Sequence, residues 1–329
     1  MNRREIVKLG LSAFAASTAA PGALWAQDKY PIRPIRLVVP FPGGGVVDTI
    51  GRLWGDGVRS DLGPVVVDNK PGAGGTIGAA DASRAKPDGY TVLLGNTSTQ
   101  ILNPAIMPSA PYDPEKSFEA VSIVANSAVA LAVNPKIPVK SLKELVAYIK
   151  ENPGKMSYGS PGAGTFTQLG AEMFKHLTGI SDADMTHVPY KGVGGAVPDV
   201  MSGTISMLAF NVTTQMIGLH KTGKMRILAV MSPKRLDVLP DVPAGAEEIP
   251  GLDATMFTGL FVPRGTPKHA IEILSNATRK AMKDEGLQKK LRASGFEIAI
   301  DTPAEAQKIV DTEQARLLKL IKEIDFKFG

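Results

Sequence analysis

A strand that runs into a glycine-rich turn and then into a helix decides the fold of this chain. From Ile35 to Asp48 the sequence reads IRLVVPFPGGGVVD. The β-branched and apolar residues before Pro40 are typical of a buried strand, and glycine permits a tight turn because it adopts positive φ without steric cost. Helix-forming residues follow Asp48. The segment therefore predicts a strand, a turn and a helix, which together make one βα unit.

Two further turns have a similar composition. Residues 157–165 read SYGSPGAGT, residues 69–76 read NKPGAGGT, and each precedes a segment that is expected to be helical. Successive N–H groups in such a turn can point at one oxygen atom, and the following helix adds the positive end of its dipole. Each turn is a candidate anion seat, and a plain strand-to-helix connection is the alternative. Neither a Gly-Lys-Ser/Thr motif nor dinucleotide spacing accompanies them.

The rest of the chain continues the alternation of strands and helices. Short apolar runs occur at residues 65–67, 91–94, 129–133, 205–210, 227–230 and 259–262. Segments of helical period lie between them, so we expect an α/β fold whose strands are mostly parallel and buried. The strands near Val129 and Gly259 could pass between two lobes.

The N-terminus resembles an export signal. Arg3 and Arg4 precede a short apolar stretch, and Ala26 is the expected cleavage site. The stretch is too short and too interrupted for a membrane anchor. The secretory and twin-arginine routes both remain possible, and the alternative is a charged first turn of a cytosolic helix. We expect a periplasmic protein.

Composition excludes several other classes. The 329 residues include no cysteine, which excludes a disulfide framework, a thiolate metal site and a lipid-modified cysteine. The formal net charge of +5 is mild and no basic run occurs, so we expect no nucleic-acid partner. The four histidines lie far apart in the sequence, so we expect no metal site and no cofactor.

Several motifs together resemble one protein family. They are PIRLVVPFP at residues 34–42, NKPGAGG at 69–75, PDGYT at 87–91, YGS at 158–160 and HVPYKG at 187–192. In this order they resemble the substrate-binding proteins of tripartite tricarboxylate transporters, also called Bug-type receptors. The resemblance implies a two-lobe periplasmic-binding-protein fold with crossing strands. It also implies an organic acid ligand (a dicarboxylate, a citrate-like acid, an acidic amino acid or an aromatic carboxylate) and a two-subunit integral membrane transporter.

The resemblance also implies a set of ligand-binding residues. In the first lobe they are Phe41, Pro42, Gly44, Gly45, Val46 and Asp48, with Thr76 and Ser98 beside them; in the second lobe they are Ser160, Ala163, Gly164 and Thr165, with Asn211 as a further polar contact. Asp48 either balances the helix dipole or receives an amino or hydroxyl group of the ligand. The segment from Tyr190 to Gly195 either caps the cleft or is only a turn. Gly43, Gln100 and Gln168 depart from the family pattern, which leaves ligand preference open.

We therefore expect a monomeric solute-binding protein with three sections. Residues 1–26 form the signal, residues 27–126 with 254–329 form lobe 1, and residues 127–253 form lobe 2. A sensing subunit for a membrane kinase is compatible with the same fold. A cleft hydrolase or transferase is the third possibility, but Ser160 has no base next to it in the sequence and lies in no Gly-x-Ser-x-Gly elbow, so we expect no catalytic residues.

Overall fold

The computed structural model describes residues 30–107 and 109–326, so the expected signal at residues 1–26 lies outside the described residues. The strands are β1 (Ile35–Val39), β2 (Val65–Asn69), β3 (Thr91–Asn96), β4 (Phe118–Val133), β5 (Met156–Ser160), β6 (Met185–Pro189), β7 (Met207–Asn211), β8 (Arg226–Met231), β9 (Thr255–Pro263) and β10 (Phe296–Ile298).

The helices alternate with these strands along the chain. They are α2 (Val46–Gly57), α3 (Arg59–Leu62), α4 (Thr76–Ser83), α5 (Asn103–Ile106), α6 (Pro114–Ser117), α7 (Leu142–Glu151), α8 (Phe166–Thr178), α9 (Val193–Ser202), α10 (Thr214–Lys221), α11 (Gly245–Glu248), α12 (Lys268–Ala281), α13 (Glu285–Ala293) and α14 (Pro303–Glu323), with short η1 (Ala73–Gly75) and η2 (Ser98–Leu102).

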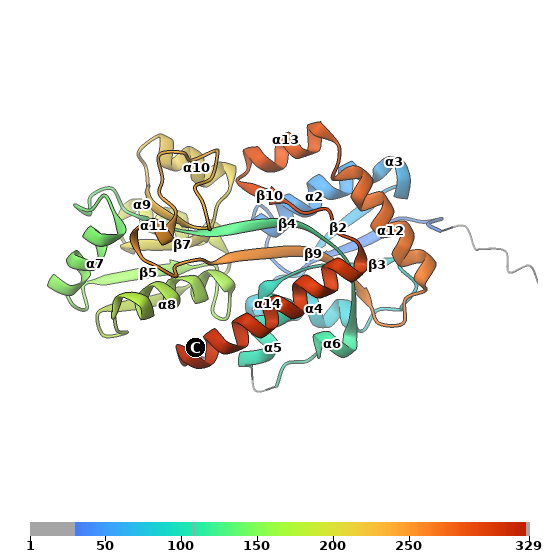
Figure 1. Cartoon of the computed structure of the whole chain (residues 1–329), viewed down its shortest axis with the longest axis horizontal. Helices are drawn as coiled ribbons and strands as arrows, with labels where there is room; N and C mark the ends of the chain where they lie inside the picture. Colours follow the sequence, from blue (N-terminus) through green and yellow to red (C-terminus); the bar gives the residue numbers. More distant parts are fainter. Residues whose placement is uncertain (1–29, 108, 327–329) are drawn as a thin grey trace, which may run out of the picture.

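The strands form two parallel groups at opposite ends of the molecule. In the first lobe β1 pairs in parallel with β2 and β3, and in the second lobe β5 pairs in parallel with β6 and β7. Figure 1 shows β2 and β3 at one end of the long axis and β5 and β7 at the other. The expected α/β class with two lobes is confirmed, and the parallel pairing that we predicted applies within each lobe.

Two strands connect the lobes. The first part of β4 pairs antiparallel with β9 from Phe118 to Ala128, and from Val129 to Val133 it pairs with β7 on one edge and β8 on the other. The partner of β4 therefore changes between Ala128 and Val129. Figure 1 shows β4 and β9 running side by side along the long axis. The limits of the two domains at residues 126/127 and 253/254 remain predictions.

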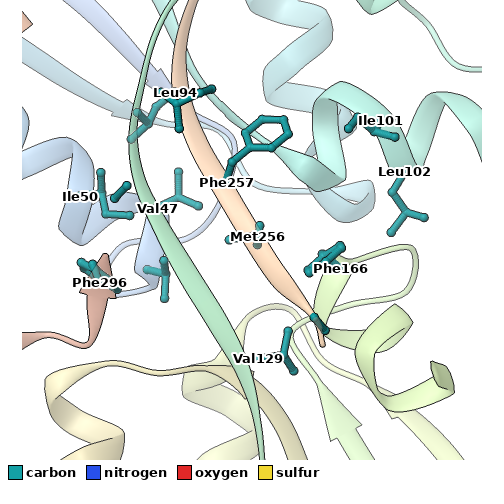
Figure 2. Close-up of a cluster of buried hydrophobic side chains, with 14 of the residues drawn as sticks. Val47, Ile50, Leu94, Ile101, Leu102, Val129, Phe166, Met256, Phe257 and Phe296 are labelled. Atoms are coloured by element: carbon teal, nitrogen blue, oxygen red, sulfur yellow. The ribbon is translucent and has the colours of Figure 1, made fainter. Parts of the chain in front are cut away.

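A hydrophobic core follows these crossing strands. Figure 2 shows Val47, Ile50 and Leu94 near one part of β4 and β9, and Val129 and Phe166 near another. On the second part of β4, the odd-numbered residues from Val129 to Val133 belong to this core, while Ala130 and Ala132 belong to a second cluster with residues of α9 and α10. Alternation along a strand thus buries both of its faces.

Buried side-chain contacts and a capping box fix the helices around the sheet. The indole of Trp54 in α2 donates a hydrogen bond to the Thr278 hydroxyl of α12 at 3.0 Å, and both side chains are buried. α14 begins with a capping box between Thr302 and Glu305 and lies across the crossing strands (Figure 1). In residues 30–107 and 109–326, no helix has both the length and the apolar character that crossing a membrane requires.

Candidate functional site

A cavity of about 250 Å³ lies between the two lobes. Its walls come from the turn before α2, from η2 and β9 in the first lobe, and from the starts of α8, α9 and α10 in the second. The lining residues are Phe41, Pro42, Gly43, Gly44, Gly45, Val46, Val47, Asn96, Ser98, Pro161, Thr165, Phe166, Thr167, Lys191, Gly192, Val193, Gly194, Gly195, Asn211, Thr213, Gln215 and Met256. We call it the inner cavity.

The first-lobe turn is held in place by Asp48. Gly44 has φ +81°, and its N–H donates to the Asp48 carboxylate at 2.9 Å. The same carboxylate accepts hydrogen bonds from Arg52 at 2.9 Å and from Asn69 at 3.0 Å. Burial alone would raise the pKa of Asp48, but these hydrogen bonds outweigh it and hold the pKa below the usual value of an aspartate. Asp48 thus uses its charge to shape the turn.

The second-lobe turn has the same construction with a neutral side chain. Gly164 has φ +71°, and its N–H donates to the side-chain carbonyl of Gln168 at 2.8 Å. In both turns the N–H of a glycine with positive φ donates a hydrogen bond to the side chain four residues later. One residue separates this glycine from the helix. That residue is the N-cap, Gly45 for α2 and Thr165 for α8.

Four helices begin at the inner cavity. Its lining includes residues from the first turn or N-cap of α2, α8, α9 and α10, among them Val47, Thr167, Gly194 and Gln215. The first N–H groups of a helix have no partner within the helix and carry a partial positive charge. No acidic residue lines this cavity among the described residues, so its polar groups favour an anion.

Ser160 has a different environment from the one we expected. It is fully buried, and its Oγ lies 2.7 Å from His187 Nε2 and donates to the carbonyl of Gly162. The structure therefore places a histidine beside Ser160 that the sequence does not; because the hydroxyl donates to Gly162, the ring N–H of His187 donates to Ser160 Oγ. Burial, together with the Lys175 ammonium, lowers the pKa of His187 to about 4, and the ring stacks on Tyr158. These contacts fix the turn below the cavity wall.

The expected site residues divide into three groups. Those that line the inner cavity are Phe41, Pro42, Gly44, Gly45, Val46, Ser98, Thr165 and Asn211. Ala163 lines a neighbouring cavity together with Thr165. Asp48, Thr76, Ser160 and Gly164 line neither cavity, and the Thr76 hydroxyl lies 3.4 Å from the sulfur of Met107.

The contribution of α10 to the cavity was not predicted from the sequence, and that of the segment before α9 was one of two alternatives. The residues from Lys191 to Gly195 line the cavity, as do Thr213, the N-cap of α10, and Gln215. The sequence left open whether the Tyr190–Gly195 segment caps the cleft or is only a turn. The structure places most of the segment at the cavity. Within residues 30–107 and 109–326 no cluster of His, Asp and Glu could hold a metal ion.

Comparison with known proteins identifies the family. The family described as tripartite tricarboxylate transporter family receptor (TctC) matches residues 50–326, which is most of the chain. This chain belongs to the TctC family. The resemblance expected from the motifs is confirmed.

Solved members of this group have the same fold. The periplasmic binding protein BugD is 30% identical, with a TM-score of 0.84, and the match covers 91% of this chain and 99% of BugD. An R. palustris protein solved with adipate is 30% identical, with a TM-score of 0.86 and coverage of 91% and 99%. MatC from Rhodopseudomonas palustris, solved with bound malate, is 28% identical, with a TM-score of 0.82 and coverage of 89% and 100%. This chain is therefore a periplasmic solute-binding protein of the TctC family.

Proposed function

We propose that this protein captures a small carboxylate-bearing solute in the inner cavity and delivers it to a two-subunit membrane transporter. The observation that carries the proposal is the convergence of four helix N-termini on one cavity between two lobes. Adipate and malate in two structural neighbours support an organic acid as the ligand. The family name supports a tripartite transporter as the partner.

Backbone N–H groups at the cavity walls support anion binding. The turn before α2 is held by the hydrogen bond from the Gly44 N–H to Asp48, so little entropy is lost when the N–H groups at the start of α2 bind an anion. Apolar surface from Phe41, Val46 and Met256 completes the walls and suits the carbon chain of the solute. We propose that Asp48 orders the first turn and does not bind the ligand directly.

A ligand screen tests the proposal. The purified protein is heated with dicarboxylates, citrate, acidic amino acids and aromatic acids, and hits are measured by calorimetry. A ligand that binds only the folded state stabilises it by about 2.7 kcal/mol when its concentration is a hundred times Kd, and the melting temperature rises as a result. Binding of at least one acid supports the proposal. If none of these acids stabilises the protein, carboxylate capture is refuted.

The delivery step and the export of the protein need separate measurements. We propose cleavage after Ala26 by the secretory or twin-arginine route and action as a monomer. N-terminal sequencing of the periplasmic protein and light scattering test these points.

Uptake of the labelled acid tests the delivery step. Uptake should fall in cells that lack the gene and recover when a plasmid supplies a copy. Unchanged uptake would favour a sensing role.

A further inference from the structure

Lys191 lies at the border between two cavities. A second space of about 400 Å³, the outer cavity, is lined by residues 71–75, 161–163 and 190–192 together with Phe41, Pro42 and Thr165. Lys191 lines both the inner and the outer cavity. A Cβ at Gly192 would lie 3.0 Å from Pro42, so these two residues meet where the cavities adjoin.

Lys191 is also the only charged residue that lines either cavity within the described part of the chain. Its ammonium has no ion pair and no side-chain hydrogen bond among the described residues. Lys175, which is buried below the same wall, is paired with Glu172 and Asp182, and Lys280 is paired with Asp61. The ammonium of Lys191 is therefore available to an anion that enters the cleft.

The anion-binding groups differ in which cavities they line: Thr165 and Gly192, the N-caps of α8 and α9, line both cavities, as Lys191 does. The first turns of α2 and α10 line only the inner cavity, through Val47 and Gln215, whereas Lys191 lines the inner cavity and its border. A monocarboxylate needs only one such group. An acid with a carboxylate at each end can use the helix N-termini at one end and the ammonium at the other.

We propose that Lys191 is a specificity-determining residue that holds the second carboxylate of an α,ω-dicarboxylate at the border of the two cavities. This inference rests on the proposed function, because it assumes that the first carboxylate occupies the inner cavity. It assigns a chemical class to the ligand: a linear acid with a negative charge at each end. Apolar lining from Phe41, Pro42 and Pro161 is shared by both cavities and suits the methylene chain.

Paired acids of equal chain length test the role of Lys191. Calorimetry measures Kd for succinate, glutarate and adipate and for the matching monoacids butyrate, pentanoate and hexanoate. The wild type should prefer the diacid of the best pair. Lys191→Met should weaken that diacid about five- to tenfold and leave the monoacid unchanged, because Lys191 is exposed and a solvent-exposed charged contact contributes modestly to affinity. Lys191→Arg should retain most of the preference.

Lys224→Met is the matched control, because Lys224 is exposed in the same lobe and lines neither cavity. It should bind both acids like the wild type. Equal diacid affinity in Lys191→Met and the wild type overturns the inference, as does an equal loss for diacid and monoacid, which would indicate general electrostatic attraction. If the wild type binds none of the acids of the wider screen, the proposed function itself fails, and this result is distinct from both.

Discussion

At the scale of single residues, polar side chains shape the two glycine-containing turns that contribute to the cavity wall. Asp48 and Gln168 each accept a hydrogen bond from the glycine four residues before them. Ser160 binds the carbonyl of Gly162 and is itself held by His187. Because these side chains are used below the surface, main-chain N–H groups remain available at the cavity, where we propose that the anion binds.

His187 should make the stability of the protein depend on pH. Its pKa falls from 6.5 to about 4 on folding because the ring is partly buried and lies near the Lys175 ammonium; the remaining exposure screens the effect. Between these values the unfolded chain binds a proton that the folded chain does not, so stability falls as pH falls from 6.5 to 4, by about 2 to 3 kcal/mol. Urea unfolding at several pH values should show this loss in the wild type and a smaller one in His187→Gln. Parallel curves for the two proteins would contradict the assignment.

The pairing of Ser160 and His187 could not be predicted from the sequence. The two residues are 27 positions apart. They meet because β5 and β6 are parallel and in a register that places Tyr158 beside His187. Sequence patterns identify the turn at Gly162, but register is set by the whole sheet. The sequence also left open whether Asp48 balances the helix dipole or binds the ligand. The answer depends on where the side chains of Arg52 and Asn69 point, and only the fold determines this.

At the scale of elements, the position of each helix on the sheet determines where its N-terminus points. The start of α2 lines the inner cavity because the helix packs closely on β1 and β3. A Cβ at Gly51 would lie 3.0 Å from Leu94 and 3.1 Å from Leu37. Glycine at this position is what allows the helix to approach the sheet so closely.

Gly51→Ala should therefore push α2 away from the sheet. We expect a loss of about 1 to 3 kcal/mol from overpacking and weaker binding of the cognate acid, because the N–H groups of α2 shift. Gly218→Ala is the control, since Gly218 lies in α10 with no atom within 4 Å of a Cβ, and it should gain about 0.5 to 1 kcal/mol. Urea unfolding and calorimetry measure both effects. Equal stability of the two variants would contradict this packing argument.

The sequence predicts some elements better than others. The strand of β1 and the start of α8 follow from apolar runs and glycine-containing turns. β6 was not predicted because Thr186, His187 and Pro189 interrupt its apolar pattern, and it lies at the end of the sheet order. Without β6 the position of the start of α9 could not be predicted, so the sequence did not show whether α9 contributes to the cavity wall.

At the scale of the whole molecule, the lobes are joined by strands and also touch across the cleft. Only residues 129–133 of β4 were predicted, because polar residues such as Glu119 and Asn126 interrupt the rest of its apolar pattern. Across the cleft, Ser98 Oγ accepts a hydrogen bond from the Phe166 N–H at 2.9 Å. Both residues are buried, and they lie on η2 of the first lobe and α8 of the second.

This contact should favour the closed arrangement of the lobes. When the cleft opens, water can satisfy the Phe166 N–H, but in a closed Ser98→Ala variant that N–H is buried without an acceptor, which costs about 1 to 3 kcal/mol. Ser98→Ala should therefore weaken binding of the cognate acid about tenfold and increase the radius of gyration at subsaturating ligand. Small-angle X-ray scattering and calorimetry measure these effects, and Ser202→Ala, at an exposed serine on α9, is the control. A Ser98→Ala variant with the affinity and radius of the wild type would show that the contact does not affect closure.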